Sequence, residues 1–198
     1  MSARVVHLVR HVPPLRPGLL LGHCDLSAEL ADCPQLRTRV ANLAISRIVS
    51  SDLRRCSVQA ARLAETLQVP LALAPDWREL DFGAWDGFEP GALDAEAVAA
   101  FWDDPEANPP PYGERWSQLC RRIERALRAL PDKALVVTHA GSMRAALSVL
   151  TGLDHRGVWA LDVPYRARLS LRIWEGDKLS GQVIGLDTGP VEGEGAHP

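Results

Sequence analysis

Short, almost wholly apolar runs alternate along this chain with longer stretches in which apolar residues recur every three or four positions. The apolar runs, and two stretches of alternating polarity near the C-terminus, predict strands. These predicted strands cover residues 5–9, 45–50, 71–74, 134–138, 165–174 and 179–186. The stretches with helical spacing predict helices at about 36–43, 53–67, 93–102, 114–130 and 143–150.

The order of these elements predicts an α/β fold. Strand and helix alternate through most of the chain, which favours a three-layer sandwich with a mostly parallel central sheet and helices on both faces. Residues from about 82 to 113 break the alternation with glycines, aromatic residues and three consecutive prolines, and we expect them to form a small helical cap inserted into the main fold. Residues 1–188 are predicted to be a single domain, and the glycine-rich, acidic tail 189–198 is predicted to be disordered.

The composition is that of an ordinary globular chain, because 46% of its 198 residues are hydrophobic and 24% are charged. The net charge of −3 gives no broad basic surface, which argues against nucleic acid as a partner. No apolar segment is long enough to span a bilayer, and the N-terminus does not resemble a signal peptide. The four cysteines lack the paired spacing of a zinc site, so we expect reduced thiols and a cytoplasmic location.

Polar residues gather at three junctions where a predicted strand gives way to a loop or a helix. Arg10 and His11 follow the first strand, the segment 51–55 follows the second, and His139 leads from the fourth strand into the small residues 140–141. The carboxyl ends of parallel strands meet at one edge of a sheet. These residues are therefore expected to share one pocket.

The residue types at these junctions suit the binding and transfer of a phosphoryl group. Two arginines can neutralise a phosphate dianion, and the amides at a helix start near Ala140 add a dipole of the right sign. A histidine among positive neighbours has a lowered pKa and a nucleophilic neutral ring, while a second histidine can stabilise charge on the phosphoryl oxygens. A carboxyl group can protonate the leaving oxygen. The candidate residues are Arg10, His11, Arg55, Glu79 and His139.

Two members of this set have rivals nearby in the sequence. Arg54 adjoins Arg55 on a predicted helix, where the two side chains point in different directions and one is expected to be solvated. Asp81 and Asp86 are rivals to Glu79 as the proton donor. A role in a helix cap or a turn would explain any of these three carboxylates equally well.

Four blocks of the sequence resemble signatures of the histidine phosphatase, or phosphoglycerate-mutase-like, superfamily, and they occur in the family's order. The blocks are 8–11 (LVRH), 51–56 (SDLRRC), 78–83 (RELDFG) and 138–141 (THAG). The resemblance extends to about residue 150 and implies that His11 is phosphorylated during turnover, with Glu79 as the general acid. It also implies that Arg55, rather than Arg54, binds phosphate and that His139 is the second histidine of the phosphate pocket.

The sequence departs from the family pattern at two places. Val12 follows the first histidine where the family usually has glycine, and Pro13 and Pro14 come next, so the phosphate contacts of this loop are expected to differ. The segment 111–115 (PYGER) matches the family's Gly-Gly-Glu-Ser block only loosely. The helix 114–130 that overlaps it has an arginine-rich face, which we expect to be solvated. That face carries Arg121, Arg122, Arg125 and Arg128.

The resemblance implies a metal-independent phosphomonoesterase that works through a phosphohistidine, acts on a small-molecule phosphate and needs no cofactor. The compact size, the small cap and the segment 101–105 (FWDDP) are most similar to the α-ribazole phosphatase branch, which serves cobalamin synthesis. A phosphoglycerate mutase is the enzymatic alternative, and a non-catalytic phospho-ligand binding protein is the alternative from another class. No membrane partner is expected, and the oligomeric state is left open, a homodimer being one option.

Overall fold

A computed structural model describes residues 3–28 and 33–189, so the tail predicted to be disordered lies, apart from Gly189, outside the described residues. At its centre is a six-stranded sheet in the order β3-β2-β4-β1-β5-β6. The strands are β1 (Ala3–Arg10), β2 (Arg47–Ser50), β3 (Leu71–Leu73), β4 (Ala134–Thr138), β5 (Arg168–Trp174) and β6 (Ser180–Asp187). Each of them overlaps a strand predicted from the sequence.

The sheet is mostly parallel, as predicted. β1 pairs in parallel with β4, β4 with β2, and β2 with β3. β5 is antiparallel to both β1 and β6, so β6 points the same way as the other four strands. The carboxyl ends of β1, β2 and β4 therefore lie at one edge, with Arg10 opposite Thr138 and Ser50 opposite Val137.

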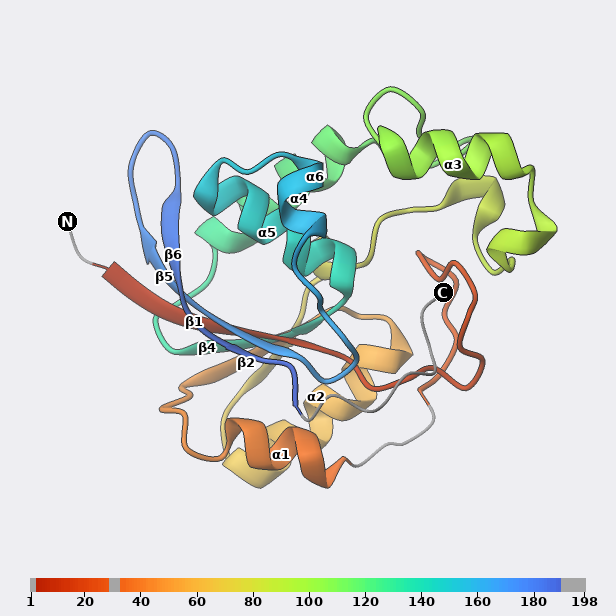
Figure 1. The fold of residues 1–198 in the computed structure, drawn as a ribbon. Helices are drawn as coiled ribbons and strands as arrows, with labels where there is room; N and C mark the ends of the chain where they lie inside the picture. Colours follow the sequence, from red (N-terminus) through yellow and green to blue (C-terminus); the bar gives the residue numbers. More distant parts are fainter. Residues whose placement is uncertain (1–2, 29–32, 190–198) are drawn as a thin grey trace.

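Helices cover both faces of this sheet. The α-helices are α1 (Pro34–Val40), α2 (Arg54–Leu67), α3 (Ala95–Asp103), α4 (Trp116–Arg128), α5 (Ala140–Thr151) and α6 (His155–Trp159). Three short 3-10 helices are η1 (Pro75–Trp77), η2 (Gly83–Trp85) and η3 (Pro90–Ala92). Figure 1 shows α4, α5 and α6 on one face and α1 and α2 on the other, which confirms the predicted sandwich. Successive residues of a strand point to opposite faces of the sheet, so Leu8 belongs to one of the two hydrophobic cores and Val9 to the other.

Several element boundaries differ from those predicted. α1 ends at Val40 rather than at residue 43, and the short α6 was not predicted because its five residues give little periodic signal. α5 begins at Ala140 rather than at residue 143, so the helix starts directly after His139. The helix start therefore lies at Ala140, where its dipole was expected to act on a bound anion.

The predicted cap contains η2, η3 and α3, and Figure 1 shows α3 at the side of the molecule, away from the sheet. Its two ends are joined, because the Ala84 N–H donates to the Pro111 carbonyl oxygen at 2.8 Å. Gly83 has φ +51°, and a Cβ there would lie 2.3 Å from the same oxygen, so only glycine fits this close approach. The chain thus leaves and returns at one place, although the cap boundaries stay a prediction.

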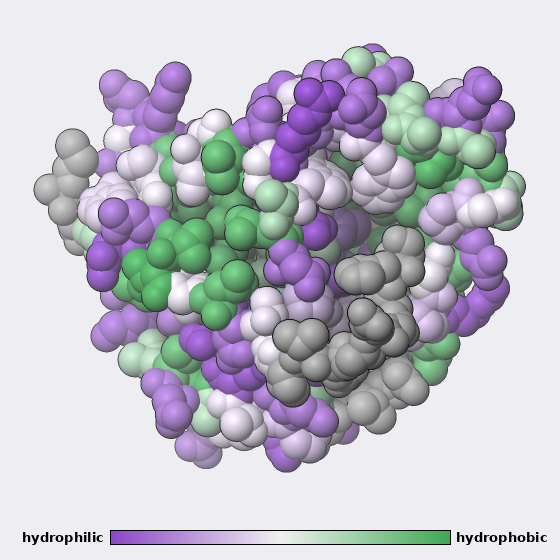
Figure 2. Space-filling view, in the orientation of Figure 1, coloured by the Kyte–Doolittle hydropathy of each residue, from purple (hydrophilic) through white to green (hydrophobic). Residues whose placement is uncertain are grey.

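The edge strand β6 carries an apolar surface. Val183, Ile184 and Leu186 are all exposed, and Figure 2 shows apolar residues gathered over this part of the molecule. Among residues 3–28 and 33–189, no helix is long and apolar enough to cross a membrane.

Candidate active site

Two histidines meet where β1 and β4 end. His11 follows β1 and His139 follows β4, and the parallel pairing of these strands places the two ring centroids 5.1 Å apart at an interplanar angle of 66°. Both rings are buried, with 5% and 1% of their surfaces exposed. The strand-end geometry expected from the sequence thus brings these two residues together.

The His11 ring is held in a single tautomer. Its Nδ1 lies 2.6 Å from the carbonyl oxygen of Val12, which can only accept a hydrogen bond, so Nδ1 carries the proton. The lone pair of Nε2 is consequently left for other chemistry. Burial holds the pKa of His11 well below its ordinary value, and the positive charges of Arg10 and Arg55 lower it further. The ring is therefore neutral near pH 7.

His139 has protein partners at both ring nitrogens. Its Nδ1 accepts a hydrogen bond from Nε of Arg55 at 3.3 Å, which places the ring proton on Nε2, 3.0 Å from the Ser51 hydroxyl. Burial, followed by the charge of Arg55 and the proximity of His11, holds the pKa of His139 well below the usual histidine value. Ser51 belongs to the segment 51–55 that was expected in this pocket, but its hydrogen bond to His139 was not predicted.

The Arg10 side chain is held in place by contacts with the segment that precedes β5. Its Nη1 donates to the carbonyl oxygen of Val163 at 2.7 Å, and its guanidinium carbon lies 3.8 Å from the centre of the Tyr165 ring. Tyr165 also packs against His11, with ring centroids 5.5 Å apart. The Arg10 Nε is buried and has no hydrogen-bond partner in the described part of the chain. Tyr165 precedes an antiparallel strand and belongs to no motif, so its place in the pocket could not be predicted from the sequence.

Arg55 is fully buried and holds the loop that precedes α1. Its guanidinium donates to the carbonyl oxygens of Leu21, Gly22 and Cys24 at 2.9, 2.6 and 2.7 Å, in addition to His139. Four of the five N–H groups of an arginine are thereby used within the protein. Arg54, the alternative considered from the sequence, has its Nε on the Ser27 hydroxyl at an exposed position. The structure thus places Arg55, and not Arg54, beside His139.

Glu79 reaches the same place from the segment after η1. Its Oε1 accepts from the N–H of Leu80 at 2.9 Å and its Oε2 from the N–H of Gly141 at 3.0 Å. Glu79 also interacts electrostatically with Arg10, which links it to the two histidines. The amides at the start of α5 were expected to face a bound anion, but the Gly141 amide is occupied by the Glu79 carboxylate. Ala140, the first residue of α5, is buried beside it.

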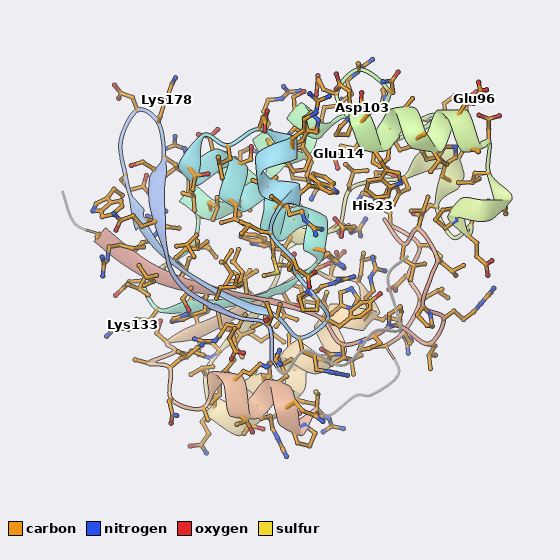
Figure 3. The ribbon with its side chains drawn as sticks, viewed as in Figure 1. His23, Glu96, Asp103, Glu114, Lys133 and Lys178 are labelled. Carbon is orange, nitrogen blue, oxygen red and sulfur yellow. The ribbon has the colours of Figure 1, made fainter. Side chains whose placement is uncertain are left out.

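Asp81 and Asp86, the two alternatives to Glu79, have partners other than His11 and His139. The Asp86 carboxylate accepts the backbone N–H groups of residues 22–24 at 2.9, 2.6 and 2.7 Å. Asp81 accepts the N–H of Gly83 at 2.9 Å and lies 3.5 Å from Nδ1 of His23. Figure 3 shows His23 on the side of the molecule where the cap helix α3 lies. Both carboxylates thus connect the loop after β1 to the cap.

Arg144 is a further cation that sequence reasoning missed. It lies on α5, donates to the Leu161 carbonyl oxygen at 3.3 Å and has its guanidinium 5.3 Å from the Trp159 ring centre. It interacts electrostatically with both Glu79 and Arg10. The described residues contain no cluster of three or more His, Cys, Asp or Glu side chains suited to a metal ion.

Residues 27–184 match the family model of the histidine phosphatase superfamily (branch 1). The chain belongs to the histidine phosphatase superfamily. The match starts after Arg10 and His11, so the case for these two residues rests on their place at the end of β1 and on their contacts. Membership in this superfamily supports a phosphatase activity for the chain.

Relatives and solved structures agree with this family. An adenosylcobalamin/α-ribazole phosphatase of Salmonella typhimurium is 26% identical over 170 residues, which are 80% of this chain and 84% of that protein. A probable phosphoglycerate mutase GpmB of Erwinia tasmaniensis is 31% identical over 127 residues, 60% of this chain and 59% of that protein. A mycobacterial glucosyl-3-phosphoglycerate phosphatase structure shares the fold, with a TM-score of 0.81 at 22% identity over 92% of this chain and 98% of that one.

Proposed function

We propose that this chain hydrolyses phosphomonoesters, without a metal ion, through a phosphohistidine formed at His11. The observation that carries the proposal is the hydrogen bond between Nδ1 of His11 and the Val12 carbonyl oxygen, at 2.6 Å. This bond keeps the ring proton on Nδ1 and leaves Nε2 with the lone pair that attacks phosphorus. Burial and two neighbouring arginines keep the pKa of His11 low, so the nucleophile is neutral when the substrate arrives.

In the first step, Nε2 of His11 attacks phosphorus and the bond between phosphorus and the ester oxygen breaks. Arg10 and the remaining N–H of Arg55 neutralise the phosphoryl oxygens, and the start of α5 at Ala140 adds its dipole. His139 turns its Nε2–H from the Ser51 hydroxyl to one of these oxygens. Glu79 in its protonated form gives its proton to the leaving oxygen, which departs as an alcohol. The step leaves a phosphohistidine and a Glu79 carboxylate.

In the second step, water attacks the phosphorus of the phosphohistidine while the Glu79 carboxylate takes a proton from that water. The phosphorus–nitrogen bond breaks and inorganic phosphate leaves. The neutral imidazole of His11 and the protonated Glu79 are restored. Because two backbone amides hold the Glu79 carboxylate at one place, the same group can serve in both steps.

The proposal predicts phosphate release from p-nitrophenyl phosphate and simple alkyl phosphates in the presence of a chelator. His11→Ala should lower kcat by about 10⁴-fold or more, since the nucleophile is lost. His155→Ala, on α6, is the control and should retain the wild-type rate. Undiminished release by His11→Ala would contradict the assigned nucleophile, and loss of activity with the chelator would contradict metal independence. No release from any ester would leave the phospho-ligand binding protein as the better description.

For the substrate we propose α-ribazole 5′-phosphate. The support is the similarity to the Salmonella typhimurium protein, at 26% identity over 80% of the chain, together with the small cap. The comparison of kcat/KM for α-ribazole 5′-phosphate with that for 3-phosphoglycerate tests this choice. A clear preference for the former is expected, and comparable values would remove the assignment while leaving the chemistry intact.

An acidic phosphoester such as 3-phosphoglycerate is the second candidate substrate, and Arg144 is the observation that favours it. This third arginine interacts with Glu79 and Arg10, and its Nε is buried without a partner in the described residues. A free guanidinium edge suits a substrate carboxylate. If the substrate is acidic, Arg144→Gln should raise KM for 3-phosphoglycerate by about tenfold and leave p-nitrophenyl phosphate unaffected, because a charged hydrogen bond is lost only with the former.

A further inference from the structure

Arg122 lies on the face of α4 that was predicted to be solvated, but only 13% of its side chain is exposed. Its Nε and Nη2 donate to the Glu114 carboxylate at 3.1 and 2.6 Å. Its Nη groups also donate to the carbonyl oxygens of Asp76, Arg78 and Glu79 at 2.9, 2.8 and 3.1 Å. All five N–H donors of the guanidinium are thereby used. The prediction of a solvated arginine face is wrong for this residue.

The backbone carbonyl groups of the segment 76–79, which ends at Glu79, accept hydrogen bonds from side chains of neighbouring elements. The Thr138 hydroxyl donates to the carbonyl oxygen of Trp77 at 2.7 Å, and the Ser142 hydroxyl donates to that of Arg78 at 2.5 Å. With the three bonds from Arg122, four successive carbonyl groups accept from side chains of β4, α4 and α5. The place of this backbone is therefore set by these donors.

Glu114 extends the network to the returning end of the cap. Its N–H donates to the Asp81 carbonyl oxygen at 2.9 Å, and its Oε2 also accepts from the Asp81 N–H at 3.4 Å. Only 14% of its side chain is exposed, and Figure 3 shows Glu114 on the same side of the molecule as His23. Removing one partner of such an ion pair leaves a poorly hydrated charge behind. The pair therefore acts as a unit that fixes the backbone on both sides of Glu79.

We propose that the Arg122–Glu114 pair is a positioning device for Glu79. It fixes the backbone from which the carboxyl group reaches the leaving oxygen, and it takes no part in holding the phosphoryl group. This inference rests on the proposed role of Glu79 as the general acid. It also gives a role to the segment 111–115, whose resemblance to a family block is loose.

The leaving group serves as the probe of proton donation. p-Nitrophenolate departs without a proton, whereas the alkoxide of an alkyl phosphate needs one, so a displaced acid slows the alkyl ester selectively. Arg122→Gln is expected to lower kcat/KM for an alkyl phosphate by about tenfold or more and for p-nitrophenyl phosphate by less than about twofold. The inhibition constant of orthovanadate, a phosphate analogue, should change by less than about twofold because the phosphoryl contacts are intact.

Glu79→Gln separates this inference from the proposed function. It should slow the alkyl ester selectively, by about 10²-fold, because the acid itself is lost. Equal losses on both esters in Glu79→Gln would mean that Glu79 is not the acid, and the proposed function would fail. If Glu79→Gln slows the alkyl ester more than p-nitrophenyl phosphate but Arg122→Gln does not, only the positioning role of Arg122 is overturned. Arg121→Gln, at an exposed neighbouring position on α4, is the matched control and should leave both rates unchanged.

Glu114→Gln keeps the proposal testable if Arg122→Gln does not fold. The amide preserves the volume and one acceptor, so a selective loss of about threefold on the alkyl ester is expected. Wild-type rates on both esters in Glu114→Gln would contradict the proposal. Equal slowing of both esters, together with weaker orthovanadate inhibition, would indicate a structural role only and would equally overturn it.

Discussion

At the scale of single residues, Gly141 shows how a missing side chain shapes the pocket. A Cβ at this position would lie 2.1 Å from Oε1 of Glu79, which is far inside any non-bonded contact. The Gly141 N–H meanwhile donates to the other carboxylate oxygen at 3.0 Å. One residue therefore binds one oxygen of Glu79 and leaves room for the other, which only glycine can do.

Gly141→Ala should displace the Glu79 carboxylate and slow alkyl phosphate hydrolysis by about 10²-fold, with a smaller effect on p-nitrophenyl phosphate. Gly91→Ala is the matched control, because a Cβ at Gly91 meets no heavy atom within 4 Å. Steady-state kinetics of both variants on the two esters is the measurement. An unchanged rate of Gly141→Ala on the alkyl ester would show that the carboxylate need not occupy this place.

The residues predicted from motifs are brought together by the structure, whereas others reach the pocket without any sequence signal. His11, His139 and Glu79 follow from strand ends and family blocks. Tyr165 precedes an antiparallel strand, so the rule about carboxyl ends of parallel strands does not cover it. The bonds of Arg55 to the loop 21–24 could not be predicted either, because that loop takes its conformation from tertiary contacts.

At the scale of elements, the loop 21–24 is bound along its backbone by two opposite charges. The Asp86 carboxylate, which follows η2 in the cap, accepts three of its N–H groups, and Arg55 on α2 donates to three of its carbonyl oxygens. The cap and the helix that follows β2 therefore hold the same loop between them. The position of this loop beside His139 depends on both.

Asp86→Asn should lower the free energy of unfolding by about 1–3 kcal/mol, because the amide nitrogen cannot accept and leaves backbone donors unsatisfied. Asp177→Asn, in the exposed turn between β5 and β6, is the control and should be neutral. Urea unfolding of the two variants and the wild type measures the difference. A neutral Asp86→Asn would mean that Arg55 alone holds the loop.

Element prediction succeeds where burial dominates and fails where a side chain reaches across elements. The strands 5–9 and 134–138 are apolar runs, and both were located to within two residues. The bounds of α4 were also predicted to within two residues. The burial of Arg122 was not predicted, because every arginine on an amphipathic helix is assigned to the polar, solvated face. Backbone carbonyls, which have no sequence signature, are its partners.

At the scale of the whole molecule, three buried histidines make stability depend on pH. Burial lowers the pKa of His7, His11 and His139 in the folded state. In the unfolded chain these groups regain an ordinary pKa of about 6.5, so the unfolded state binds more protons below that pH. The contribution of these three histidines to the free energy of unfolding is therefore fully present above about pH 6.5 and is lost as the pH falls below it.

Urea unfolding at pH 7.5, 6.5 and 5.5 should show a falling free energy, by up to about 1.4 kcal/mol per pH unit for each of the three histidines. His7→Gln should reduce this slope without touching the proposed chemistry, since His7 bonds the Ser170 hydroxyl at 2.9 Å. If the pH dependence of the free energy of unfolding is the same in His7→Gln as in the wild type, His7 does not contribute to it.

The position of β1 in the sheet has a consequence for how the protein is made. Its neighbours are β4 and β5, and His7 bonds Ser170, 163 residues further along the chain. The strand that leads to His11 is thus translated well before β4 and β5, which leave the ribosome long afterwards. Until then it is an unpaired apolar segment of the kind that invites aggregation. Assembly of the pocket must wait for the distant C-terminal strands, so no N-terminal fragment ending before β4 can contain it.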